Sequence, residues 1–293
     1  MSVGVAQTIV WLNGERCADD AAHVSARDRG FTLADGVFET MRARGGKVFR
    51  LARHLARLER ALTVLEIPVP SQLHEWVAHA AQASSGEDSS LRLTVTRGAG
   101  PAGVAPPSAP RPTVIVSAGP MPLFPESTYA AGLSAHVASG RRNEYAMTAG
   151  LKTLAYVDAV AGLLEARRAG ADEALFLDTE GHCSEATSSN LFIWTGAELV
   201  TPPLSCGVLP GITREAVLEL ARSEGLPVAE RAFELDELLS ADEAFLTSSL
   251  RGVAPLVRVG TDPIGQAVPG HWTRQLGTGY LALVGLECGL FGP

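Results

Sequence analysis

The N-terminal part of the chain switches between helix-like and strand-like spacing of apolar positions. Between residues 51 and 67, leucines recur every three or four residues, which is the period of one face of an α-helix. Leu91–Thr96 instead alternates apolar and polar residues, as a half-buried strand does. The same criteria predict strands at 8–12, 37–42, 47–50 and 113–117, a second helix at 72–82, turns at 13–14, 28–36 and 45–46, and a loop at 98–112.

The C-terminal part alternates more regularly between helices and strands. An apolar run at 174–177 is followed by Asp178-Thr179-Glu180-Gly181, so we expect a strand that ends in a tight turn. Gly225 is a typical residue to end a helix. The pattern predicts helices at 156–169, 213–224 and 270–284, and strands at 174–177, 190–194, 198–201, near 228 and at 243–246. Short elements of both kinds in both halves indicate two mixed α/β domains, at 1–126 and 127–293.

Composition narrows the class of protein. A chain of 293 residues with 46% apolar residues can bury a core for two modest domains, which excludes a disordered chain. The formal net charge is -8 and Lys and Arg do not cluster, so we expect neither a nucleic-acid partner nor an anionic membrane partner. Because no run of about 20 apolar residues occurs, we expect no membrane span and a cytoplasmic location.

The four cysteines show no spacing that is typical of metal sites. Cys17, Cys183, Cys206 and Cys288 form no CxxC pair and have no accompanying histidine pattern. We therefore expect reduced, ordinary thiols, with neither a disulfide framework nor a metal site.

Three short segments carry candidate chemistry. Lys152 is flanked by Leu151 and by Leu154-Ala155, an apolar setting that suits a reactive amine. Glu185 supplies a carboxylate, and Gly211-Ile212-Thr213 opens a predicted helix whose free N–H groups can bind an anion. Each segment also has a structural interpretation: a surface lysine at a helix start, a carboxylate at a strand end, and an ordinary helix cap.

The order and spacing of these segments resembles the fold-type IV family of pyridoxal 5′-phosphate (PLP) enzymes over nearly the whole chain. The family contains branched-chain aminotransferases, D-amino-acid aminotransferases, (R)-selective amine transaminases and aminodeoxychorismate lyases. The resemblance implies a two-domain fold, with a small N-terminal α/β domain and a larger C-terminal α/β pseudo-barrel domain. It also implies PLP as cofactor, amino acids and keto acids as small-molecule partners, and a homodimer.

The resemblance assigns cofactor roles to particular residues. Lys152 would form the Schiff base with PLP and move the proton during the reaction, and Glu185 would face the pyridine nitrogen. Arg57 would bind the phosphate, although composition alone does not separate it from its neighbours Arg50, Arg53 and Arg60. The remaining residues implied to contact the cofactor are Tyr156, which is equally well explained as a core tyrosine, and Leu209, Gly211, Ile212, Thr213, Ser248 and Ser249.

The substrate side is more ambiguous. Thr40 resembles the lyases, but the loop at 98–112 has Ala102 and Val104 where lyases and D-amino-acid enzymes carry a carboxylate-binding Arg or His. Arg92 is the candidate to compensate, and its alternative is a half-exposed strand arginine. The resemblance further implies an apolar pocket wall at Leu33 and Phe38, and carboxylate binding by backbone N–H groups near Leu250 and Arg251.

These residues favour a transaminase that moves an amino group between an amino acid and a 2-keto acid. We expect D-amino acids as donors, with (R)-amines as further donors. The first alternative is an aminodeoxychorismate lyase that releases 4-aminobenzoate and pyruvate, and the second is a branched-chain L-amino-acid aminotransferase. A non-catalytic cofactor-holding protein on the same fold would be expected to lack the Lys or the Glu, and both are present.

Overall fold

The computed structural model describes residues 8–18, 21–84 and 88–289, and its chain forms two compact units. Unit 1 comprises Met1–Pro122, Leu151–Ala155 and Val284–Pro293, and unit 2 comprises Leu123–Gly150 and Tyr156–Leu283. The five residues Leu151–Ala155 therefore fold with unit 1, although the segments before and after them in the sequence belong to unit 2.

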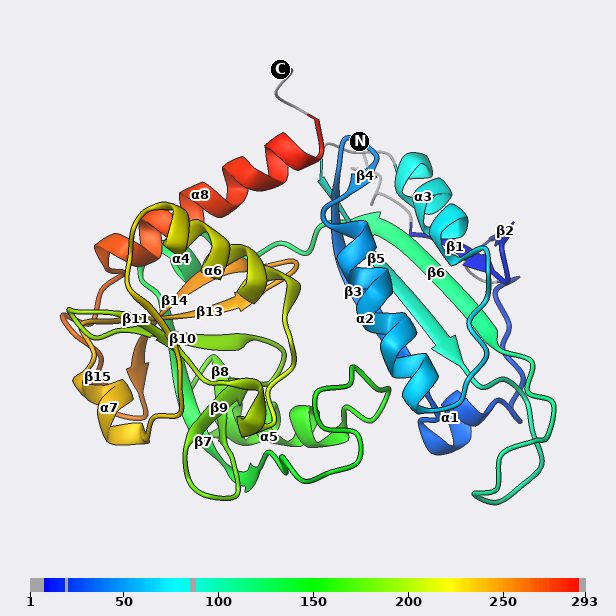
Figure 1. The fold of residues 1–293 in the computed structure, drawn as a ribbon, viewed down its shortest axis with the longest axis horizontal. Helices are drawn as coiled ribbons and strands as arrows, with labels where there is room; N and C mark the ends of the chain where they lie inside the picture. The colour runs from blue at the N-terminus through cyan, green and yellow to red at the C-terminus, as the bar shows by residue number, and fades with distance from the viewer. Residues whose placement is uncertain (1–7, 19–20, 85–87, 290–293) are drawn as a thin grey trace. The chain divides into compact units, whose positions relative to one another are not determined.

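Unit 1 is built on an antiparallel sheet with the strand order β2-β1-β6-β5-β3-β4. Side chains alternate between the faces of a strand, so Val37 and Met41 of β3 and Leu93 of β5 enter one core. Helices α2 and α3 lie along this sheet and bury their leucine and alanine side chains in the same core (Figure 1). The elements are β1 (Ile9–Leu12), β2 (Glu15–Cys17), α1 (Arg29–Leu33), β3 (Gly36–Arg44), β4 (Lys47–Val48), α2 (Leu51–Val64), α3 (Leu73–Ala83), β5 (Asp88–Thr96) and β6 (Thr113–Pro120).

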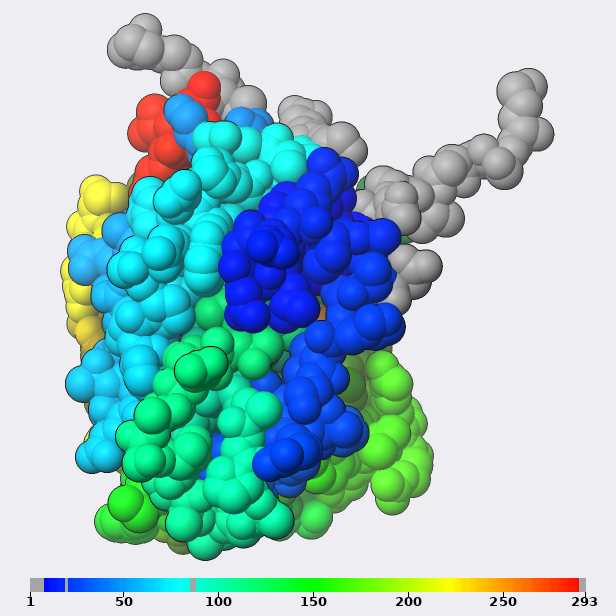
Figure 2. Space-filling view, turned by 90° about the vertical axis from the view of Figure 1, so that its right-hand side faces the viewer, coloured from blue at the N-terminus to red at the C-terminus, as the bar shows by residue number. Residues whose placement is uncertain are grey.

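The predicted hairpin at 13–14 is present and needs its glycine. Gly14 has φ +87°, and a Cβ atom there would lie 2.4 Å from Nε1 of Trp76 on α3. Figure 2 shows the blue β1–β2 hairpin beside the cyan atoms of α3 on the surface of this unit. Only glycine both adopts this backbone conformation without strain and lets the indole approach so closely.

The predicted turn at 28–36 contains a short helix, α1, which the sequence analysis did not expect. Asp28 caps it: its carboxylate accepts hydrogen bonds from Gly30 N (2.8 Å), Thr96 Oγ1 (2.9 Å) and Thr113 Oγ1 (2.7 Å). An aspartate at a helix N-terminus satisfies backbone N–H groups that have no partner within the helix. The two threonines attach the capped helix to β5 and β6.

Unit 2 contains a barrel-like sheet. The strand order is β12-β11-β10-β13-β14-β7-β8-β9, β15 pairs with β14, and β9 pairs with β10 as well as β8. That additional pairing closes β10, β13, β14, β7, β8 and β9 into a ring, so the predicted mixed α/β fold with a pseudo-barrel is confirmed. The elements are α4 (Ser127–Ala130), β7 (Leu133–Arg141), α5 (Val157–Arg168), β8 (Glu173–Leu177), β9 (Cys183–Ala186), β10 (Asn190–Trp194), β11 (Leu199–Thr201), η2 (Leu204–Cys206), α6 (Ile212–Ser223), β12 (Val228–Glu230), α7 (Leu235–Ser240), β13 (Glu243–Ser248), β14 (Gly252–Val259), β15 (Asp262–Pro263) and α8 (His271–Glu287).

Several elements differ from the prediction for identifiable reasons. The prediction lacked β14 because Pro255 has no N–H group; the strand tolerates it because its pairing with β7 begins only at Leu256. The predicted helix at 51–67 ends at Val64, before Glu66 turns to φ +52°. The predicted strand at 47–50 is only Lys47–Val48. The elements β7, β9, β15, α4 and α7 were not predicted at all.

Among the helices in the described part of the chain, none is long and apolar enough to cross a membrane.

Candidate functional site

Lys152 is placed by backbone pairing with strand β3. The N–H of Phe38 donates to the carbonyl of Lys152 at 3.0 Å, and the N–H of Leu154 donates to the carbonyl of Gly36 at 3.0 Å. An isolated bridge joins Val37 to Thr153 between them. The segment that carries Lys152 therefore continues the sheet of unit 1 as a short additional edge, and the lysine backbone has a fixed position.

Two cationic side chains lie at the ring of Phe38. Lys152 Nζ is 4.5 Å and Arg92 Cζ is 3.9 Å from the ring centroid, and Phe38 as a whole is 4% exposed. The electron-rich face of an aromatic ring attracts such cations. Thr40 stands opposite Arg92 in the β3–β5 register and shares the Phe38 face of its strand. The structure thus brings four residues predicted for catalysis or substrate binding onto one face of unit 1.

Arg57 is held on the opposite face of β3. Its Nε and Nη2 atoms donate to the two carboxylate oxygens of Glu39 at 2.8 and 2.7 Å. His54 Nδ1 lies 2.7 Å from the same carboxylate. Of the other arginines on this helix, Arg50 pairs with Glu287 at 3.4 Å, and Arg53 and Arg60 are exposed. The buried Glu39 carboxylate thus orients Arg57, while the phosphate-binding role of Arg57 stays a prediction.

Glu39 and His54 are residues that sequence reasoning missed. Burial by itself would raise the pKa of Glu39, but the guanidinium of Arg57 and the hydrogen bond of His54 lower it to about 2. Burial lowers the pKa of His54, which favours the neutral imidazole. The alternation along the strand could have revealed Glu39. It occupies the same face as Val37 and Met41, where an apolar residue is expected.

The loop at 98–112 carries no cation at its predicted substrate positions. From residue 98 to residue 110 its sequence contains no Lys, Arg or His. Arg29 holds the loop instead: its guanidinium donates to the carbonyls of Gly103 (3.0 Å) and Val104 (2.9 Å) and pairs with Asp35 (2.8 Å). The Val104 side chain is 84% exposed and Leu33, at the end of α1, is 44% exposed. Both positions expose apolar side chains, and the role of Leu33 in a substrate pocket stays a prediction.

In unit 2, main-chain and side-chain donors converge on Glu185. Its Oε2 accepts from Leu209 N at 2.9 Å and from Asn190 Nδ2 at 3.4 Å, and its Oε1 pairs with Arg142 Nε at 3.3 Å. The Glu185 side chain is 12% exposed. Asn190 also donates to the Leu209 carbonyl at 2.9 Å. These contacts fix the orientation of a partly buried carboxylate; neither Asn190 nor Arg142 had been given a role from the sequence.

The start of helix α6 is shaped around Asn190. Gly211 is the N-cap residue, and a Cβ atom on it would lie 2.0 Å from Asn190 Oδ1. Ile212 and Thr213 follow in the first turn, where backbone N–H groups lack partners within the helix. Among the described residues, the buried hydroxyls of Ser189 and Thr247 have no hydrogen-bond partner, and Asn190 and Thr247 are register partners in β10 and β13. A helix N-terminus and unpaired hydroxyls together are typical of an anion site.

Four more predicted residues lie at the end of β13 and in the turn that leads to β14. Ser248 Oγ accepts the N–H of Arg251 at 3.4 Å, and Ser249 and Leu250 lie between them. The guanidinium of Arg251 pairs with Glu173 at 3.2 Å. Tyr156 is the N-cap residue of α5 rather than a helix-core residue. Their roles toward a cofactor or substrate stay predictions.

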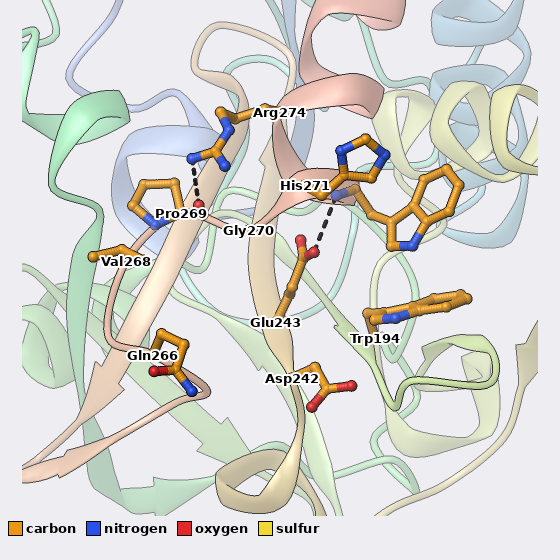
Figure 3. A pocket seen from close by; sticks show the side chains of 10 residues that line it. Trp194, Asp242, Glu243, Gln266, Val268, Pro269, Gly270, His271 and Arg274 are labelled. Carbon is orange, nitrogen blue, oxygen red and sulfur yellow. Dashed lines mark hydrogen bonds between the residues drawn. The ribbon is translucent and has the colours of Figure 1, made fainter.

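A separate hollow of about 430 Å³ lies at the other ends of β10 and β13. Trp194 pairs with Glu243 in the strand register, whereas Asn190 pairs with Thr247. Figure 3 shows Glu243 directed at the start of α8, where the N–H of Trp272 donates to it at 3.0 Å. The Glu243 carboxylate caps that helix, and none of the residues predicted to bind cofactor lines this hollow.

Known proteins of similar sequence include transaminases of two kinds. The family model described as amino-transferase class IV matches residues 36–259. A putative branched-chain-amino-acid aminotransferase of Methanocaldococcus jannaschii is 35% identical, over 91% of this chain and 93% of that protein. A D-alanine aminotransferase of Bacillus licheniformis is 33% identical, over 92% of this chain and 94% of that protein.

Solved structures of similar fold extend the range of activities. A 4-amino-4-deoxychorismate lyase from Pseudomonas aeruginosa has a TM-score of 0.83 and 34% identity, covering 92% of this chain and 97% of that chain. A T.th. branched-chain amino acid aminotransferase with pyridoxamine 5′-phosphate has a TM-score of 0.87 and 28% identity, covering 94% of each chain. Similarity of this extent to both transaminases and a lyase does not by itself select the reaction.

The Glu39 carboxylate predicts a specific loss of stability in acid. Its pKa is about 2 in the folded protein and 4.5 as the ordinary value, so its contribution is complete above about pH 5 and is lost as the pH falls toward 2. The difference in unfolding free energy between the native protein and a Glu39→Gln variant should therefore shrink below pH 4.5, by up to about 1.4 kcal/mol per pH unit.

Denaturant unfolding between pH 7 and pH 3 measures this difference. Glu59→Gln, an exposed change on α2, is the matched control and should give a curve parallel to that of the native protein. A constant difference for Glu39→Gln across the whole range would contradict the assignment of a buried, ionised Glu39.

Proposed function

Because the chain belongs to the class IV aminotransferase family, we propose that it is a transaminase that moves an amino group between a D-amino acid and a 2-keto acid. Enzymes of this family use PLP as cofactor. The main observation behind the proposal is that the structure fixes and partly shields one lysine, Lys152. The expected homodimer and cytoplasmic location stay predictions.

The chain contains only two lysines, Lys47 and Lys152. Lys47 is exposed as the first residue of the short strand β4. Lys152 is instead fixed by the pairing of its segment with β3, and its amine lies at the ring of Phe38. A lysine that bonds to an aldehyde cofactor must be positioned and partly shielded from water, and only Lys152 meets that requirement.

The residues present fit a phosphate-bearing aromatic cofactor. The α6 N-terminus, the unpaired buried hydroxyl of Thr247 and the close approach of Gly211 to Asn190 form a cradle for an anion. We assign phosphate binding to Ile212 and Thr213 of that cradle, together with Arg57, whose guanidinium Glu39 orients. Leu209, whose N–H also orients Glu185, would contact the cofactor ring.

When bound, PLP supplies an electron sink for the electron pair released at the Cα atom of the amino acid. Glu185, held as described by Leu209 N, Asn190 and Arg142, would supply the negative charge that keeps the pyridine nitrogen protonated. Lys152 Nζ would take up the proton released at Cα and would deliver a proton to C4′ of the cofactor before hydrolysis releases the keto acid. The fixed backbone of residues 151–155 limits how far that amine can move.

The distribution of cations favours a substrate with one carboxylate. Arg92 beside Phe38 is the cation that we assign to the substrate carboxylate. The loop at 98–110 adds none, and Arg29 is committed to the loop carbonyls and Asp35. Aminodeoxychorismate is more anionic than a simple amino acid, so one of its negative charges would have no cationic partner beside Arg92 and the loop at 98–110. This supports transamination over the lyase reaction.

Donor preference is inferred from two positions. The resemblance places a tyrosine and a glycine of branched-chain enzymes at Leu33 and Thr40, and this chain has neither. The D-alanine aminotransferase relative is nearly as similar as the branched-chain one. The identities of these relatives therefore do not decide between the donors, and the two positions are what support D-amino acids over branched-chain L-amino acids.

The Gly211→Ala variant should bind PLP at least about tenfold more weakly than the native protein. An added Cβ would lie 2.0 Å from Asn190 Oδ1, so either the α6 N-terminus or Asn190 must shift from its position. Fluorescence titration of the apoprotein with PLP measures the affinity. Gly140→Ala, where the nearest atom to an added Cβ is 3.9 Å away, is the control and should bind PLP normally. Native affinity in Gly211→Ala would argue against the cradle.

A donor screen tests the reaction itself. With 2-oxobutyrate, a keto acid with one carboxylate, as acceptor, the holoenzyme should transfer the amino group from D-alanine at least about tenfold faster than from L-alanine or L-leucine. A difference in how the carboxylates of the two enantiomers bind can give a ratio of this size. Lys152→Ala should be inactive with every donor and provides the background. Faster reaction with L-leucine would select the branched-chain alternative. Pyruvate released from aminodeoxychorismate, without transfer from any amino acid, would select the lyase.

A further inference from the structure

Three metal-ligating side chains that are scattered in the sequence meet at one point of unit 2. Asp178 follows β8, His182 precedes β9, and Cys206 ends the short helix η2. One ligand atom from each lies within 4.8 Å of the other two. His182 Nδ1 is 3.1 Å from Asp178 Oδ2, and Cys206 Sγ lies within 4.8 Å of a carboxylate oxygen of Asp178.

The turn between β8 and β9 explains the position of Asp178 but not the presence of His182 and Cys206 beside it. Asp178 Oδ1 accepts the N–H groups of Glu180 (3.1 Å) and His182 (2.8 Å), a common way for an aspartate to close a turn. That role needs neither an imidazole nor a thiol. His182 Nδ1 nevertheless lies beside the second oxygen, Oδ2, and Cys206 Sγ lies within 4.8 Å of a ligand atom of each residue, so the presence of these two side chains requires another explanation.

Two of the three side chains are buried and one is partly exposed, so an ion could reach them from the exposed side. Asp178 and Cys206 are each 3% exposed, whereas the His182 side chain is 28% exposed. The backbone N–H groups on Oδ1 fix the direction of the carboxylate, as outer hydrogen bonds do for metal ligands. Glu180, with Oε2 3.9 Å from His182 Nδ1, adds negative charge at the open side.

We propose that Asp178, His182 and Cys206 bind a divalent transition-metal ion of the zinc type. A carboxylate oxygen, an imidazole nitrogen and a thiolate sulfur are the ligands that zinc takes in proteins, and three protein ligands leave a fourth position for water. On binding, the Cys206 S–H bond breaks, its proton passes to solvent and the sulfur bonds to the metal. This site is independent of the proposed transaminase activity.

The bound ion would stiffen a segment that supports Glu185. The carbonyl of Cys206 accepts the hydroxyl of Ser184 at 2.7 Å, and three residues later Leu209 N donates to Glu185. A metal bond to Cys206 therefore joins the β8–β9 turn to the stretch from η2 to Leu209. We expect zinc to raise the melting temperature of the protein, because it binds the folded state and not the unfolded chain.

Titration of the chelator-treated holoprotein with ZnCl2 tests the proposal. Isothermal titration calorimetry should show one ion per chain, and Cys206→Ser and His182→Asn should each weaken binding at least about tenfold. Cys288→Ser and His136→Asn are the matched controls and should bind zinc as the native protein does. Circular dichroism of each variant before the titration confirms that it is folded.

X-ray absorption of the zinc-loaded native protein gives an answer that does not depend on variants. It should show one sulfur neighbour at about 2.3 Å and the remaining neighbours as nitrogen or oxygen at about 2.0–2.2 Å. The absence of stoichiometric binding, a spectrum without sulfur, or equal affinity in Cys206→Ser and the control variants would each overturn the proposal.

Discussion

The position of the reactive amine depends on two backbone hydrogen bonds, Phe38 N–H to the Lys152 carbonyl and Leu154 N–H to the Gly36 carbonyl. A lysine side chain has many rotamers and orders poorly by itself. The pairing removes the backbone part of that freedom by joining residues 151–155 to an ordered strand. Gly36 allows the approach, since a Cβ there would lie 2.9 Å from a Leu154 methyl and 2.6 Å from the Val95 carbonyl.

Strand β3 consequently serves two tasks through its two faces. On one face, Phe38 gathers Lys152 and Arg92 around an aromatic ring. On the other, Glu39 holds Arg57 and His54 within the core beneath α2. The Glu39 carboxylate can be buried only because both Arg57 and His54 bind it. Removal of either partner would leave part of the buried charge without a hydrogen bond. Unit 2 uses the same principle at Glu185, where backbone and amide donors fix the carboxylate.

Much of the fold follows from the sequence, because local periodicity and glycine positions decide it. The leucine spacing located α2, and Gly211 and Gly225 marked the two ends of α6. The missed elements are those where tertiary structure overrides local preference, such as β14 with Pro255 and the α1 helix capped by Asp28. The closure of the barrel depends on the pairing of β9 with β10, which no local pattern reveals.

The candidate site divides in the same way. Lys152, Glu185 and the Gly211 segment were identified because they resemble a family pattern in order and spacing. Their supporting residues were not, because each acts through a contact between distant segments: Glu39 reaches Arg57 across a strand and a helix, and Asn190 reaches Gly211. The grouping of Cys206 with His182 was invisible for the same reason, since no short spacing connects them.

Reduction of the holoprotein with borohydride, followed by peptide mapping, tests the central claim most directly. The chain offers only Lys47 and Lys152, so the result is a choice between two peptides. The placement of Lys152 beside Phe38 predicts that the phosphopyridoxyl group is found on Lys152 alone. A label on Lys47, or none on either lysine in protein that retains transaminase activity, would contradict it.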